Sequence, residues 1–129
     1  MNYTNTEKEI RALDFQMIIS FIFILATLVS IIITYNESYY LKYGRRLINL
    51  KDAKTITKIN RIIIIILLFA FLYISYQIRE IDAAKGKNLT PDDLQILASY
   101  LSILAGLVVL YIVFKYSEDA LTTTENPSI

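Results

Sequence analysis

Three long stretches of this chain carry no charged residue: residues 15–36, 62–78 and 94–114. They contain 22, 17 and 21 residues and consist mainly of Ile, Leu, Val and Phe. As α-helices they would span roughly 33, 25 and 31 Å, against a bilayer hydrocarbon core of about 30 Å. The sequence therefore predicts an all-α integral membrane bundle of three transmembrane helices.

The composition excludes several other classes of protein. Hydrophobic residues make up 55% of the 129 residues, and a soluble domain of this length cannot bury three helices that are apolar on every side. We therefore treat residues 1–129 as one membrane domain that ends in a disordered polar tail from about residue 118 to 129. The chain has no Cys and no His, so we expect no catalytic residue, no cofactor and no metal site. The net charge of +1 does not suggest nucleic acid, and no small-molecule substrate is evident.

Local signals predict where the helices begin and end. Thr6 is placed to cap the first helix, Asp52 the second and Thr90 the third, because side-chain oxygens of these residue types accept hydrogen bonds from the first free backbone N–H groups. Gly86 is a candidate for the left-handed residue that follows the second helix.

Basic residues concentrate in the segment between the first two spans, which predicts the orientation. This segment and the tail together hold eight Lys and Arg residues, against five in the other two flanking segments. The positive-inside rule then places the N-terminus outside and the C-terminus in the cytoplasm, with a basic cytoplasmic helical hairpin between helices 1 and 2. The hairpin either only sets the topology or also contacts anionic lipid headgroups or an acidic partner. Its basic residues are Lys42, Arg45, Arg46, Lys51, Lys54, Lys58 and Arg61.

Polar and small residues form a seam along two of the spans. The first span carries Gln16, Ser20, Thr27, Ser30 and Thr34, and the third carries Gln95, Ser99, Ser102 and Gly106. Small residues let membrane helices approach closely, and hydroxyl groups bond across helices. We expect these seams to pack the three helices together, with the five isoleucines of residues 62–66 facing lipid. The alternative is that Gln16, Ser20, Thr27 and Ser30 line a pore.

Three helices make a thin bundle, so we expect the chain to form a homo-oligomer or to join a larger membrane complex. The leading hypothesis is a small non-enzymatic membrane protein that acts as a structural or accessory subunit of such an assembly. Frequent Ile, Asn, Lys and Tyr residues have AT-rich codons, which favours a bacterial cytoplasmic membrane, with a virus or another AT-rich source as the alternative.

Two other functions fit the same outline. With three spans and its N-terminus outside, the chain resembles the three-span phage holins, and this resemblance implies a self-assembling pore. The long basic first loop and the weakly charged tail differ from those proteins, which usually carry basic clusters in the tail. The remaining alternative is a small immunity or regulatory protein that binds another membrane protein.

Overall fold

The computed structural model describes the backbone of residues 2–116 and the side chains of residues 6–116. It contains α1 (Asn2–Tyr43), α2 (Leu50–Ala84) and α3 (Thr90–Lys115), and the part described includes no strand. Each helix is long and apolar enough to cross a membrane. This confirms the predicted all-α fold with three helices of membrane-spanning length. The predicted disordered tail lies outside the described residues.

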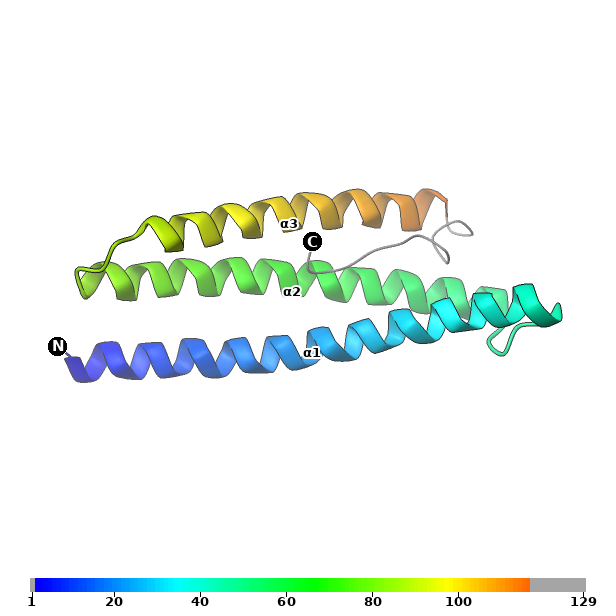
Figure 1. Ribbon diagram of the computed structural model, residues 1–129, viewed down its shortest axis with the longest axis horizontal. Helices are drawn as coiled ribbons and strands as arrows, with labels where there is room; N and C mark the ends of the chain where they lie inside the picture. The colour runs from blue at the N-terminus through cyan, green and yellow to red at the C-terminus, as the bar shows by residue number, and fades with distance from the viewer. Residues whose placement is uncertain (1, 117–129) are drawn as a thin grey trace.

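The three helices lie side by side, with α2 between α1 and α3 (Figure 1). Short connections at residues 44–49 and 85–89 make neighbouring helices antiparallel. Within the described residues, no Cα atom of α1 comes within 8 Å of a Cα atom of α3. The fold is therefore an open layer in which α2 supplies both interfaces, and it differs from the closed bundle that we expected.

The first interface joins α1 to α2 through buried side chains that recur every seven residues. On α1 this row consists of Ala12, Ile19, Ala26 and Ile33, each at most 5% exposed. The matching row of buried residues on α2 consists of Ala53, Asn60, Leu67, Ile74 and Ile81. A seven-residue repeat keeps one face of a helix toward its neighbour when the two wrap around each other with a left-handed twist. The buried residues thus have the spacing of an antiparallel coiled coil.

Asn60 places a buried amide group within the row on α2. Its Nδ2 donates to the carbonyl oxygen of Ala26 at 3.1 Å and to Oγ of Ser30 at 3.1 Å. A buried amide costs free energy unless it is hydrogen-bonded. A shift of α2 along α1 would break both bonds, so Asn60 selects this register over the others.

The second interface joins α3 to the opposite side of α2. The buried residues of α3 are Ile96, Ser99, Ile103 and Val113. Gly106 lies in the same row, seven residues after Ser99 and seven before Val113. A Cβ atom at Gly106 would lie 2.8 Å from Cδ1 of Ile65 and 3.0 Å from Cδ1 of Leu68. The missing side chain therefore lets α3 approach α2 closely.

The run of five isoleucines at residues 62–66 does not lie wholly on the lipid-facing side. Ile64 is 2% exposed and packs with Ala26, Leu68 and Ile103, so it contacts residues from all three helices. The prediction is wrong for Ile64, because five consecutive residues cover more than one turn of 3.6 residues. At least one of them must then face a neighbouring helix.

Two of the predicted N-caps are displaced along the chain. The N-cap of α2 is Asn49, whose Oδ1 accepts from the backbone N–H of Asp52 at 2.8 Å and whose Nδ2 donates to Oδ2 of Asp52 at 2.9 Å. Asp52 thus bonds to the capping residue through both its backbone N–H group and its side chain. The N-cap of α3 is Leu89, and the backbone N–H of Thr90 donates to Oδ1 of Asn88 at 3.1 Å. The predictions of Asp52 and Thr90 as caps are therefore wrong.

Of the two remaining predictions for helix ends, the one for Thr6 is wrong and the one for Gly86 is confirmed. α1 begins four residues before Thr6, so the predicted cap at Thr6 is wrong. The carboxylate of Glu9, which would complete that cap, instead forms an ion pair with Lys85 at the far end of α2. Gly86 follows α2 with a φ angle of 71°, which confirms the predicted left-handed residue.

We expect Gly106→Leu to weaken the α2–α3 interface, because the new side chain would overlap Ile65 and Leu68. Overpacking of this kind typically costs about 1–3 kcal/mol. Val108→Leu adds a methylene group on an exposed side of the same helix and is the matched control. Thermal unfolding in detergent should show a lower midpoint for Gly106→Leu alone, and equal midpoints would contradict the close approach at Gly106.

Candidate functional site

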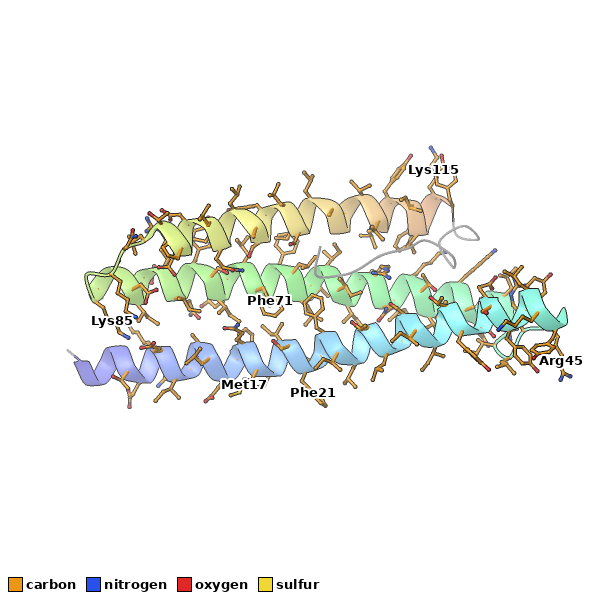
Figure 2. All side chains as sticks on the ribbon, viewed as in Figure 1. Met17, Phe21, Arg45, Phe71, Lys85 and Lys115 are labelled. Atoms are coloured by element: carbon orange, nitrogen blue, oxygen red, sulfur yellow. The ribbon has the colours of Figure 1, made fainter. Side chains whose placement is uncertain are left out.

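A hollow of about 540 Å³ lies between α1 and α3 over the surface of α2. Its lining residues come from all three helices: Ser20, Phe23, Ile24, Thr27, Leu28, Leu68, Phe71, Gln95, Ser99 and Ser102. All of them fall within the three uncharged stretches, so in a bilayer the hollow lies at the depth of the hydrocarbon chains. Phe71 points from α2 toward α1, and its ring centroid lies 5.4 Å from that of Phe23 (Figure 2). The hollow therefore combines an aromatic, apolar base with polar walls.

The polar side chains on these walls have few partners within the protein. Oγ1 of Thr27 donates to the carbonyl oxygen of Phe23 on its own helix at 2.9 Å. In the part of the chain whose side chains are described, no intramolecular hydrogen bond is made by the side chains of Ser20, Gln95, Ser99 and Ser102. Ser99 is only 7% exposed, so the hollow is where its hydroxyl group can find a partner. Polar groups at hydrocarbon depth need such partners, because lipid chains supply none.

A second hollow, of about 690 Å³, continues along α1 toward its N-terminus and is lined by residues of α1 alone, Asp14 among them. It runs from Ile10 to Ile24 and shares Ser20 and Ile24 with the first hollow. Together the two follow one side of α1 from Ile10 to Leu28, a length of about 27 Å at 1.5 Å per residue. We call this combined surface the α1 groove. Its residues from Gln16 to Leu28 lie within the first uncharged stretch, whereas Ile10, Leu13 and Asp14 precede that stretch.

The predicted seam residues do not form one contact but lie at several different sites in the structure. Ser20, Thr27, Gln95, Ser99 and Ser102 surround the first hollow, and Gln16 lines the second. The others lie elsewhere: Ser30 accepts a hydrogen bond from Asn60 of α2, Thr34 donates to the Ser30 carbonyl oxygen at 2.9 Å, and Gly106 packs on α2. The seams of α1 and α3 therefore do not pack on each other, because the α1 groove lies between them.

The turn between α1 and α2 is held by Asn36, a role that the sequence did not suggest. Asn36 is 1% exposed, its Nδ2 donates to the carbonyl oxygen of Ile48 at 3.0 Å, and its Oδ1 accepts from the N–H of Ile48 at 2.8 Å. One side chain thus satisfies both backbone groups of a residue in the connection. The only signal in the sequence is that Asn36 is the last residue of its uncharged stretch.

A partly buried ion pair lies beside this contact. Nε of Arg46 donates to Oε1 of Glu37 at 2.8 Å, and the guanidinium group lies 3.9 Å from the centroid of the Tyr40 ring. Both partners are largely shielded from solvent, which makes such a pair stronger than one on an open surface. Arg46 therefore serves to fold the hairpin.

The other basic residues of the hairpin also differ in exposure. Arg61 is buried, and its Nη2 lies 3.4 Å from Oγ of Ser30 on α1. The ammonium group of Lys58 lies 5.5 Å from the centroid of the Phe114 ring on α3. The remaining members lie on the outside of the hairpin with at least partial exposure: Lys42, Arg45, Lys51 and Lys54. The exposed basic surface of the hairpin therefore contains fewer than the seven basic residues in its sequence.

The polar groups of the first hollow are hydroxyl and amide groups, and the second hollow adds the carboxylate of Asp14. Hydroxyl and amide groups donate and accept hydrogen bonds. Within the described residues, no group of three or more His, Cys, Asp or Glu residues is arranged to hold a metal ion. No family model, curated protein or solved structure matches the chain. Its function must therefore be inferred from the groove and the hairpin themselves.

We expect Asn36→Leu to loosen the turn between α1 and α2. The substitution leaves the N–H and C=O groups of Ile48 without their partner, and an unsatisfied buried polar group costs about 1–3 kcal/mol. Amide hydrogen exchange should become faster at residues 44–52. Ser38→Ala, two residues along the same helix, is the control and should leave exchange unchanged. Unchanged exchange in Asn36→Leu would show that Asn36 does not hold the turn.

Proposed function

We propose that this protein is a small non-enzymatic subunit of a larger membrane assembly, and that the α1 groove receives a transmembrane helix. The observation that supports this is the set of polar side chains without intramolecular partners on both walls of the first hollow, where the groove has α1 on one side and α3 on the other. Ser20 lies on the α1 wall, and Ser99 and Ser102 lie on the α3 wall. An entering helix offers these groups hydrogen-bonding partners, which lipid chains do not.

The shape of the groove favours a helix over other occupants. It follows α1 for about 27 Å, which is about eighteen residues of helix at 1.5 Å each. Its base contains Phe23, Leu68 and Phe71, which pack against apolar side chains. The first hollow is lined by neutral residues alone, so the charged ring that makes many pores selective is missing there. A subunit that packs against a helix therefore has more support than a pore.

We further propose that the N-terminus lies outside and that the hairpin between α1 and α2 lies in the cytoplasm. The eight basic residues on one side against five on the other favour this orientation. The exposed lysines of the hairpin would then lie near the anionic inner leaflet, where each basic residue contributes about 1 kcal/mol of attraction.

The groove hypothesis predicts that Ser102→Phe abolishes the assembly. The aromatic ring would fill the hollow between α1 and α3 and exclude the entering helix. Mass measurement of particles extracted directly in native lipid should show the variant at the mass of one chain and the parent protein at a higher mass.

Leu104→Phe is the matched control, because Leu104 is exposed and lies on a different side of the same helix. It should assemble like the parent protein. Thermal unfolding of Ser102→Phe verifies that the three-helix layer itself is intact. A parent protein that has the mass of one chain, or a folded Ser102→Phe variant that still assembles, would refute the proposed function.

The proposed orientation predicts the labelling of single cysteines, which is unambiguous because the chain has none of its own. In intact cells, an impermeant thiol reagent should label Lys87→Cys, in the connection between α2 and α3. It should label Leu47→Cys, in the hairpin, only after the membrane is opened. The reverse pattern would place the hairpin outside.

A further inference from the structure

α1 carries a second row of residues with coiled-coil spacing. The row advances by alternating steps of three and four residues and consists of Ile10, Leu13, Met17, Ser20, Ile24, Thr27, Ile31 and Thr34. It is separate from the buried row that packs on α2. Ser20 is half-buried, and the others are exposed. From Ile10 to Thr27 the row runs along the α1 groove.

We infer that the helix that enters the α1 groove is α1 of a second copy of this chain. This inference rests on the proposed function and adds the identity of the partner. Copies inserted in the same orientation have their α1 helices parallel, so identical residues lie at the same depth. Along a parallel seam, each residue of the row therefore meets its own counterpart.

The chemistry of the row suits contact between identical residues. A hydroxyl group both donates and accepts a hydrogen bond, so two copies of Ser20 can satisfy each other. Two carboxylates in the same place would repel, and Asp14, the charged residue that lines the second hollow, lies beside the row and not in it. Thr27 lies one heptad further along and keeps free acceptor capacity after it donates to the Phe23 carbonyl oxygen. The small side chain of Ser20 also lets the two α1 backbones approach closely.

The residues between these hydroxyl groups supply the apolar half of the seam. Ile24 and Ile31 alternate with Thr27 and Thr34, and β-branched residues at the corresponding heptad position favour parallel two-stranded coiled coils. Both isoleucines are more than half exposed in a single copy. A second α1 would cover them.

The wall formed by α3 supports the same arrangement independently. Ser99 is more than nine-tenths buried, lines the hollow and makes no hydrogen bond within the described chain. An α1 helix of the second copy that lies along Ser20 and Thr27 would pass Ser99 and Ser102. Two-fold symmetry about the membrane normal then lets each copy place its α1 in the groove of the other, so that both grooves are filled by one contact.

Disulfide cross-linking tests this arrangement on the naturally cysteine-free chain. Two Cys residues bridge only when their Cα atoms come within about 7 Å. Ser20→Cys and Thr27→Cys, oxidised with copper phenanthroline in native membranes, should each form covalent dimers that disappear on reduction. Ile18→Cys and Leu25→Cys are the controls. Each is exposed, lies two residues before its test position at nearly the same depth, and faces the opposite side of α1.

The outcomes separate the identity of the partner from the proposed function. Dimers at Ser20→Cys and Thr27→Cys but not at the controls support the inference. Equal cross-linking at all four positions indicates random collision and overturns it. If no test position cross-links while Ser102→Phe still lowers the mass of the assembly, the entering helix belongs to another protein and only this inference falls. If Ser102→Phe also has no effect, both proposals fall.

Discussion

The fold depends on α2, which packs against a different helix on each side. Buried residues such as Asn60 and Leu67 recur every seven positions toward α1, while Ile65 and Leu68 meet Gly106 of α3. Because no Cα atom of α1 comes within 8 Å of one of α3 in the described residues, each of these helices is placed mainly by its own interface with α2. In lipid, apolar side chains gain little by leaving one hydrocarbon environment for another. Close packing and the buried amide of Asn60 must therefore determine how the layer is arranged.

The α1 groove is a consequence of this arrangement. Two helices that pack on opposite sides of a third leave space between them, and their flanking residues then line that space. Thr27 and Ser102 flank the rows that α1 and α3 use to pack on α2, so both end up beside the hollow. A closed bundle of three helices would bury these groups against each other. The open layer leaves them available to another helix.

The sequence was sufficient to predict three helices of membrane-spanning length. Charge and hydropathy can be read along the chain without knowing which residues lie close together in space. The terminal Gly86 was also predictable from local chemistry. The faces of the helices were not, because a uniformly apolar helix carries no strong periodic signal. Ile64 was assigned to lipid for this reason, although it contacts all three helices. The role of Asn36 depends on a residue twelve positions later, which no local pattern indicates.

Among the buried polar residues of the described chain, Asn36 and Asn60 differ from Ser99 in their partners, and this difference supports the proposed assembly. The side-chain amide groups of Asn36 and Asn60 are buried, and each forms a hydrogen bond with the backbone of another segment of the chain. Ser99 is comparably buried yet has no partner within the described chain. Both asparagines are explained by the fold of one copy. Ser99 lines the hollow without a hydrogen-bonding partner in the described part of a single copy, and a second α1 within the groove would supply one.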